Sequence, residues 1–415
     1  MNLLSKKQPG LFSIPVIVAA LGYFVDIYDL LLFGIIRQPS LNSLGLSADQ
    51  VDSKGLLIIN IQMIGLLIGG IISGIIGDKK GRLSVLFGSI LLYSLANIAN
   101  GFVQTVEQYA ICRFIAGLGL AGELGVGITL VSEILPREKR GIATSMVAGI
   151  GLSGAVLAFI LKETFDWRTC YFIGGGMGLL LLVTRIGVFE SGMFHSVKKE
   201  SVERGNFLML FNNKDRFNRY IKSILIGLPT WFVIGILVTF SNKFAKEFGI
   251  PEKIDTGKSI MYAYAAISVG DILIGFLSQA VKSRKKALYV FYAITALGIY
   301  LYFFHLYGAT DERLYLVCAL LGFGTGFWAI FVTMGAEQFG TNLRATAATT
   351  IPNMVRGSLT LITLLFTSLQ NITSFTTAGL ITGIVVMLIG VTSVYFTRET
   401  FGKDLNYLET NDIMP

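Results

Sequence analysis

The sequence of 415 residues is poor in charge, histidine and cysteine. Only 14% of its residues are charged, 53% are hydrophobic, and the mean hydropathy is +0.67, which excludes an ordinary soluble domain. Its two histidines (His195, His305) and three cysteines (Cys112, Cys170, Cys318) form neither a metal-ligand spacing nor a disulfide framework. A P-loop and a Ser/His/Asp set are also absent, so the sequence predicts a protein that is not an enzyme and uses no cofactor or metal.

The chain instead contains a series of apolar runs long enough to cross a ~30 Å hydrocarbon core as helices, which takes about 20 residues each. The polar alternation of a membrane β-barrel is missing, so we expect helices that satisfy their own backbone groups. The first run is too long for a signal peptide and lacks a cleavage site, so we expect it to remain in the protein. The twelve predicted spans are 11–36, 55–77, 84–104, 107–131, 142–161, 170–189, 221–241, 258–281, 287–307, 313–336, 346–369 and 374–397.

Lysine and arginine are distributed unevenly between the connecting loops. Loops on the side of the N-terminus hold 22 of the 34 basic residues and the opposite loops hold nine, while Arg113, Arg185 and Arg356 fall within or near the apolar runs. Because basic loops are retained in the cytoplasm, we expect a multi-pass protein of the cell inner membrane with both termini cytoplasmic. The net charge of +8 is then a topology signal, and no nucleic-acid partner is expected.

Two segments repeat weakly along the chain. Residues 122–144 and 326–348 align without a gap, which matches Glu133 with Glu337 and Arg140 with Arg344. Transporter folds are commonly doubled in this way. The sequence therefore predicts two pseudo-symmetric six-helix bundles, residues 1–189 and 221–397, joined by a cytoplasmic loop at 190–220 and followed by a cytoplasmic tail at 398–415.

The turn after the second run, GDKKGRLSVL, concentrates charge of both signs between two glycines. Gly77 and Gly81 permit a tight reversal between antiparallel helices. Asp78 can accept hydrogen bonds from exposed amides or pair with a cation, and Arg82 follows it by four residues. The alternative is a loop that serves topology alone.

This turn resembles the G-x-x-x-D-R/K-x-G-R motif between the second and third helices of the major facilitator superfamily. The resemblance covers nearly the whole chain, since residues 113–122 are similar to the fourth-helix R-x-x-x-G-x-G motif. GYFVDIYDLLLFG, DWRTCYF, ESGMF and RETFGKDL are similar to the metabolite:proton symporter and sugar-porter branches, although Gly192 and Phe401 replace their usual proline and lysine. The resemblance implies an all-α membrane protein of twelve helices, proton coupling at Arg113, and a cytoplasmic gate motif that holds the outward-open state: Gly77, Asp78, Gly81 and Arg82.

Charges inside the apolar runs are the candidates for chemistry, because an ionised side chain in hydrocarbon costs at least ~2.5 kcal/mol. Asp26 and Asp29 share one helix face with Tyr23, at a depth that should match Arg113. Glu123 can share a cavity-facing surface with Arg113. We therefore predict Asp26, Asp29, Arg113 and Glu123 as proton-coupling residues. The alternatives are carboxylates that touch water near a helix end and, for Glu123, a structural ion pair.

Arg356 lies near the middle of the eleventh run, far from any basic loop. Together with Arg113 it is placed to form a two-armed clamp for a carboxylate, although structural pairing with Asp271 or with carbonyls is the alternative. Tyr262, Tyr264 and Asn353 are further cavity candidates that we do not retain. The predicted substrate-binding residues are Tyr23, Gln62, Arg113, Trp231, Trp328 and Arg356.

These features predict a secondary active transporter that imports a small polar metabolite, an organic anion or zwitterion, together with protons by alternating access. A proton-driven antiporter that exports an amphipathic compound is the alternative, and a membrane receptor or enzyme is a third. The expected partners are a small-molecule substrate, protons and the lipid bilayer. We expect the chain to act as a monomer.

Overall fold

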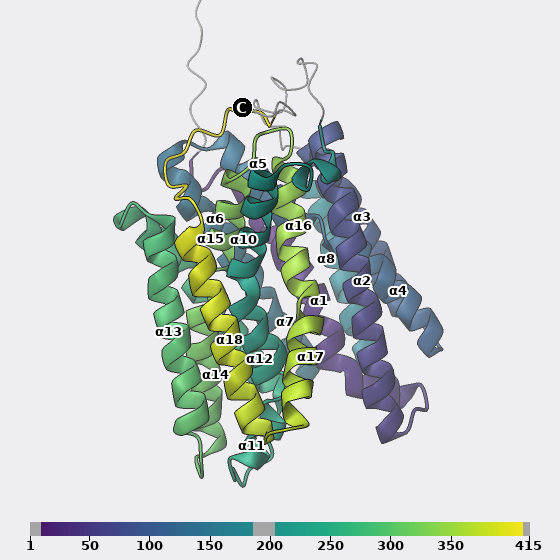
Figure 1. Cartoon of the computed structure of the whole chain (residues 1–415). Helices are drawn as coiled ribbons and strands as arrows, with labels where there is room; N and C mark the ends of the chain where they lie inside the picture. Colours follow the sequence, from purple (N-terminus) through teal and green to yellow (C-terminus); the bar gives the residue numbers. More distant parts are fainter. Residues whose placement is uncertain (1–9, 186–203, 410–415) are drawn as a thin grey trace, which may run out of the picture.

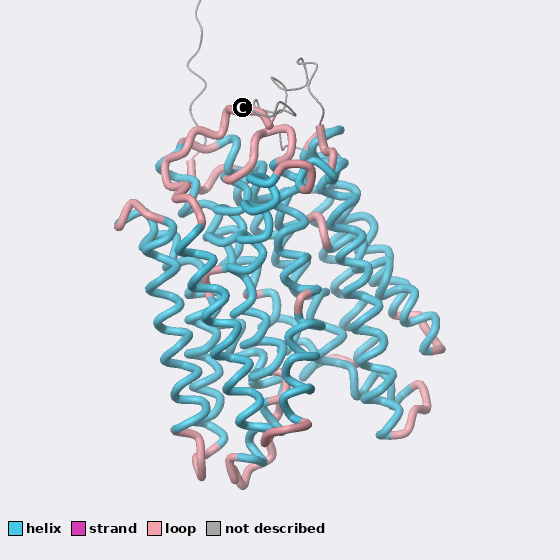
Figure 2. Tube along the Cα trace, viewed as in Figure 1, coloured by secondary structure: helices cyan, strands magenta, loops and turns pink. Residues whose placement is uncertain are grey.

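The computed structural model describes residues 10–185 and 204–409, and within them it is helical, without a strand (Figure 2). The described residues make twelve helical crossings, several of which consist of two consecutive helices. Lys6, Lys7, Gly192, His195 and the ESGMF segment lie outside the described residues.

Six crossings come from the first half of the chain: α1 (Ile14–Ser43), α2 (Ala48–Lys80), α3 (Arg82–Asn100), α4 with α5 (Val106–Leu120, Glu123–Ile134), α6 with α7 (Arg137–Leu152, Gly154–Thr164) and α8 (Trp167–Thr184). Six come from the second half: α10 with the π-helix η3 (Lys214–Phe232, Val233–Val238), α12 (Thr256–Ala280), α13 (Arg284–Phe304), α14 with α15 (Asp311–Thr325, Trp328–Glu337), α16 with α17 (Arg344–Gly357, Leu359–Gln370) and α18 (Phe375–Phe396). The short helices η2 (Phe207–Leu210) and α11 (Ser241–Glu247) lie in connections.

Ten of these crossings are long and apolar enough to span a membrane, and α8 and the α16–α17 pair complete the twelve. Each predicted span corresponds to one crossing, so the predicted fold class is confirmed. The ends differ where local capping outweighs hydropathy. α10 begins at Lys214, inside the predicted loop 190–220, because the Asn213 side chain accepts hydrogen bonds from the amides of Asp215 and Arg216.

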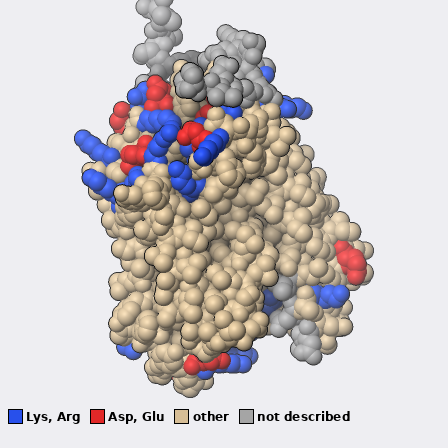
Figure 3. Space-filling view, in the orientation of Figure 1, with Lys and Arg blue, Asp and Glu red and all other residues tan. Residues whose placement is uncertain are grey.

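The crossings form two groups that pack against each other at one end of the bundle (Figure 1). There α16 lies against α2 and α5, and α6 lies against α12. The same end carries the α2–α3 turn and the C-terminal segment 397–409, and we call it the tail end. On the face shown in Figure 3, lysines, arginines and acidic residues gather at the tail end, whereas other side chains cover the middle. This distribution suits a protein whose middle lies in a bilayer.

Small residues bring the helices into backbone contact. A Cβ on Gly154 of α7 would lie 2.1 Å from the Phe24 carbonyl oxygen of α1, and a Cβ on Gly322 of α14 would lie 2.2 Å from the Ala263 carbonyl oxygen of α12. Membrane helices use such small residues because packing, and not the hydrophobic effect, drives their association. These contacts fix how each helix is rotated, and thereby which side chains face the centre of the bundle.

Candidate substrate site

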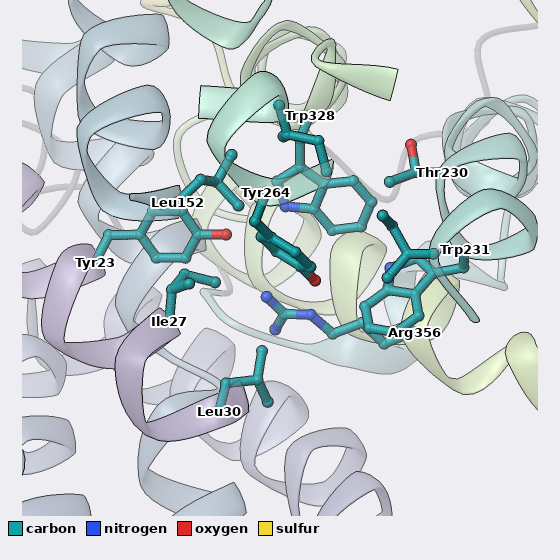
Figure 4. Close-up of a pocket in the computed structure, with 11 residues that line it drawn as sticks. Tyr23, Ile27, Leu30, Leu152, Thr230, Trp231, Tyr264, Trp328 and Arg356 are labelled. Carbon is teal, nitrogen blue, oxygen red and sulfur yellow. The ribbon is translucent and has the colours of Figure 1, made fainter. Parts of the chain in front are cut away.

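A small cavity lies between the two halves, in the middle of the bundle. Both halves contribute to its wall, and aromatic rings dominate one side of it (Figure 4). The lining residues are Tyr23, Ile27 and Leu30 of α1, Leu152 of α6, Thr230 and Trp231 of α10, Ile234 of η3, Tyr264 and Ile267 of α12, Trp328 of α15 and Arg356 of α16.

The guanidinium of Arg356 extends into the centre of this ring of residues (Figure 4). Its Nη1 donates to Asn353 Oδ1 at 2.9 Å, and its Cζ lies 5.9 Å from the ring centroid of Trp328. The side chain is buried, Nε has no hydrogen-bond partner among the described residues, and no carboxylate of these residues lies within ion-pair distance. The alternative given for Arg356, a structural pairing with Asp271, is therefore not seen among these residues.

A break in the tenth crossing presents Trp328 to the cavity. α14 ends at Thr325 and α15 begins at Trp328 itself, so the first turn of α15 has amides without intrahelical acceptors. Asp271 of α12 supplies an acceptor, since its Oδ1 lies 2.9 Å from the amide nitrogen of Ala329. Close packing reinforces the break, because a Cβ on Gly326 would lie 2.7 Å from the Cα of Gly270.

Two ion pairs occupy the core of the first half. Arg113 Nη2 donates to Asp29 Oδ1 at 2.9 Å and to Asn97 Oδ1 at 2.8 Å, and its Cζ lies 5.0 Å from the ring centroid of Tyr171. We expected the acidic face of α1 to contact Arg113, and Asp29 makes this contact. However, Arg113 does not line the cavity, so this structure does not bring Arg113 and Arg356 together as the predicted clamp. Its guanidinium is held inside the first half by Asp29 and Asn97.

Glu123 forms an ion pair with Arg185 at the end of α8, and Arg185 Nη1 also donates to the Leu86 carbonyl oxygen at 2.7 Å. This arrangement corresponds to the structural alternative for Glu123, with an arginine 62 residues away in sequence. Asp26 differs from both paired carboxylates. It is 1% exposed, its Oδ1 has no hydrogen-bond partner among the described residues, and Arg356 exerts the largest attractive electrostatic effect on it.

Of the six predicted substrate-binding residues, four line the cavity: Tyr23, Trp231, Trp328 and Arg356. Gln62 does not, because its Nε2 donates to the Leu30 carbonyl oxygen at 3.3 Å and holds α2 against α1. Sequence reasoning set aside Tyr264 and missed Thr230. Both lie on faces that only the packing of α10 and α12 defines, although Tyr264 and Ile267 have the i, i+3 spacing of one helix face.

The predicted gate motif lies where the two halves meet at the tail end. Asp78 Oδ1 accepts from the Ala345 amide at 3.0 Å, and Oδ2 accepts from the Thr346 amide at 2.8 Å and from Thr346 Oγ1 at 2.7 Å. The carboxylate thus binds the first turn of α16, whose free amides and dipole favour an anion. Gly81 adopts φ +110°, which makes the turn, and a Cβ on Gly77 would lie 3.1 Å from Ala345 Cβ.

Arg82 connects the gate motif to a buried charge network across the halves. Its Nη2 donates to Glu133 Oε1 at 2.8 Å, and Arg344 Nη1 of the second half donates to the same oxygen at 2.9 Å. Glu337, which the sequence repeat aligns with Glu133, occupies an equivalent position in the second half and accepts from Arg284 Nη2 at 3.2 Å. The tail end is closed by paired charges in both halves.

The C-terminal segment 397–409 covers this network. Thr400 Oγ1 donates to Glu337 Oε2 at 2.7 Å, Thr341 Oγ1 donates to the Leu405 carbonyl oxygen at 3.1 Å, and Arg137 pairs with Asp404 at 2.6 Å. Burial alone would raise the pKa of Glu399. Hydrogen bonds from the Ser283 hydroxyl and from backbone amides at the start of α13 outweigh burial, so the pKa is lowered.

The described residues contain no group of three or more His, Cys, Asp or Glu side chains that could hold a metal ion. The site is a mainly apolar cavity with the Arg356 guanidinium at its centre. It lies between two helical halves that charge networks join at the tail end. Such a site defines a carrier of small molecules by analogy with the way transporters place binding sites at the interface of their repeats.

Comparisons with known proteins identify the family. The family model of the Major Facilitator Superfamily matches residues 19–362. The chain is 26% identical over 365 residues to the niacin transporter NiaP of Acinetobacter baylyi, covering 80% of this chain and 81% of that one. It is also 26% identical over 348 residues to the cis,cis-muconate transport protein of the same organism, covering 81% and 82%. The structure resembles the proton:xylose symporter XylE with a TM-score of 0.77 at 17% identity, over 95% of this chain and 98% of that chain.

The chain therefore belongs to the Major Facilitator Superfamily and is a multi-pass membrane transporter, not an enzyme. The resemblance predicted from the gate motif is confirmed. The likeness to XylE at this identity establishes the shared fold.

Proposed function

We propose that this chain is a proton-coupled symporter that imports a small organic anion with a flat, unsaturated body. The observation that carries the proposal is Arg356, a buried cation at the cavity centre without a carboxylate partner among the described residues. Arg113 and Arg185, the other two arginines predicted within apolar runs, are paired with Asp29 and Glu123. An unpaired arginine at this depth is costly, which favours a role in binding an anionic ligand.

The residues that line the cavity favour a flat ligand. Trp231, Tyr264 and Trp328 place ring surfaces around the guanidinium, and Tyr23 closes the opposite side. Aromatic faces favour flat unsaturated ligands by stacking, while arginine binds a carboxylate through two parallel hydrogen bonds. Niacin and cis,cis-muconate, which the two relatives transport by name, are both unsaturated carboxylates of this kind.

Asp26 is the carboxylate best placed to carry the proton. Asp29 and Glu123 are held by arginines, whereas Asp26 has no ion-pair partner among the described residues and experiences the charge of Arg356. An anion that binds Arg356 removes the favourable interaction of Asp26 with that cation. Protonation of Asp26 would then accompany substrate binding, which couples the two.

The basic loops indicate how the protein is oriented in the membrane. The tail end holds the α2–α3 turn and Arg137, and by the positive-inside rule this end faces the cytoplasm of the cell. With the network at this end closed, the cavity would take its substrate from outside, which is the first step that an importer needs. Import is the expected direction, and export of an amphipathic compound is the alternative.

Uptake of radiolabelled nicotinate into proteoliposomes with an inward proton gradient tests the proposal. Nicotinamide is the matched control, because it has the same ring and size but no carboxylate. We expect nicotinate to be accumulated and nicotinamide to compete poorly. Equal competition by the two would contradict a site built around Arg356, and gradient-driven efflux in place of uptake would favour the antiporter.

Two variants separate binding from coupling. Arg356→Lys should weaken nicotinate binding by about 10- to 100-fold, since a hydrogen bond to a charged group contributes ~1.5–3 kcal/mol and lysine lacks the planar fork. Asp26→Asn should abolish uphill accumulation but retain exchange of substrate for substrate, which needs no net proton movement. Full uphill accumulation by Asp26→Asn would assign the coupling to another group.

A further inference from the structure

Asn353 joins the cavity arginine to the opposite half of the protein. The residue lies on α16, three positions before Arg356, and is 1% exposed. Its Oδ1 accepts from Arg356 Nη1 at 2.9 Å. Its Nδ2 donates to the Thr349 carbonyl oxygen at 2.8 Å within α16 and to the Ala121 carbonyl oxygen at 3.1 Å in the first half.

The carbonyl that Asn353 binds lies at a break in the fourth crossing. α4 ends at Leu120 and α5 begins at Glu123, so carbonyls at this point lack regular intrahelical donors. Such groups need a partner inside a membrane protein, and Asn353 supplies a donor from the other half. The fit is tight, because a Cβ on Gly70 of α2 would lie 2.6 Å from Asn353 Nδ2.

The position of this bond makes it part of any opening at the tail end. α16 packs against α2 and α5 of the first half, and these are the surfaces that must separate if the cavity is to open on that side. The bond between Asn353 and Ala121 crosses this interface, and the same side chain accepts from Arg356 of the cavity. It must therefore break in every transport cycle that alternates access.

We propose that Asn353 is a positioning residue that ties Arg356 to the first half while the cavity is empty, and that an anion on Arg356 loosens this tie. The second part rests on the proposed function. A cation that donates to Oδ1 polarises the amide and strengthens its N–H donation to Ala121. A carboxylate that binds the guanidinium offsets this charge and competes for Nη1, so substrate binding weakens the contact that keeps the tail end closed.

The test measures accessibility at the tail end in protein reconstituted into nanodiscs. In a background without native cysteines, Ser145→Cys is the reporter, because Ser145 is buried at the tail end against Gly275 of the other half. Asn353→Ala should raise ligand-free labelling roughly threefold to tenfold, the loss expected for one hydrogen bond. Nicotinate should raise labelling in the parent and add little in Asn353→Ala.

Asn97→Ala is the matched control. Asn97 is equally buried and its Oδ1 accepts from an arginine, Arg113, at 2.8 Å, but this bond stays within the first half. Its ligand-free labelling should equal that of the parent. Asn353→Asp is a second variant of the same shape, which keeps the acceptor for Arg356 but removes donation to Ala121, and it should also raise ligand-free labelling.

If both Asn353 variants are labelled without ligand as slowly as the parent, Asn353 does not hold Arg356 to the first half and the proposal is overturned. If ligand-free labelling rises in these variants but nicotinate still increases their labelling as much as it does in the parent, the anion does not act by loosening the Asn353 contact. If nicotinate leaves the labelling of the parent unchanged although the parent takes it up, the loosening by the anion is overturned. If the parent does not take up nicotinate either, the proposed substrate is contradicted and the contact made by Asn353 is tested by the variants alone. The two proposals therefore fail by different results.

Discussion

Asp78→Asn should shift the protein away from the conformation closed at the tail end. Asp78 is 1% exposed and accepts three hydrogen bonds from Ala345 and Thr346 at the start of α16. It therefore joins the two halves directly. The substitution keeps the shape of the side chain while it removes the charge and one acceptor oxygen.

The size of the effect follows from the bonds that are lost. Asparagine retains one carbonyl oxygen for the Ala345 amide, but its NH₂ group faces the Thr346 amide. A hydrogen bond to a charged group contributes ~1.5–3 kcal/mol, and the Thr346 hydroxyl can rotate to accept from the new amide. We expect a net loss of about 2–3 kcal/mol in the closed state, which is roughly a 30- to 150-fold change in the equilibrium.

Cysteine accessibility measures this equilibrium. Ser145→Cys reports opening at the tail end, and Thr230→Cys reports the cavity wall. Asp78→Asn should increase labelling at the first position and decrease labelling at the second from the opposite side. Asp404→Asn is the control, because Asp404 also pairs between elements at the tail end but is 63% exposed. Such exposed pairs contribute only ~0–1 kcal/mol.

Unchanged labelling at both reporters in Asp78→Asn would refute the gate interpretation. An equal change in Asp404→Asn would also refute it, because it would assign the effect to the net charge at the tail end. Folding is checked independently by the elution profile and thermal stability of each variant.

Three further predictions concern stability. Gly326→Ala should lower thermal stability by about 1–3 kcal/mol because its Cβ would overlap α12, whereas Gly176→Ala should not, since nothing lies within 4 Å there; equal effects would contradict the packing. Arg185→Met should cost about 3–5 kcal/mol by leaving Glu123 buried and unpaired, and adding Glu123→Leu should restore part of it. Because the pKa of Glu399 is lowered, its stabilisation should be present at neutral pH and lost only as the pH falls through the lowered value, below the usual ~4.3. Proteolysis of the tail against pH, with Glu399→Gln as a pH-insensitive control, measures this.

The sequence alone determined the number of crossings, their approximate bounds and the place of the gate motif. Length and hydropathy suffice for this because insertion of a helix into a bilayer depends on the residues of that segment alone. Asp78 could be singled out because glycines and charges at a helix turn act through local geometry. Arg356 could be singled out because its distance from the ends of its apolar run, 346–369, already implies burial.

Only the tertiary structure determined which buried carboxylate pairs with which arginine. Asp26 and Asp29 share one helix face, so the sequence could not tell that Asp29 would pair with Arg113 while Asp26 has no ion-pair partner within residues 10–185 and 204–409. That choice depends on the rotation of α1, which close contacts such as Gly154 against Phe24 fix. Among the described residues Arg356 has no carboxylate partner, and Asp271 instead accepts from the first turn of α15. Contacts between helices far apart in sequence set these outcomes, and hydropathy and spacing within one helix carry no information about them.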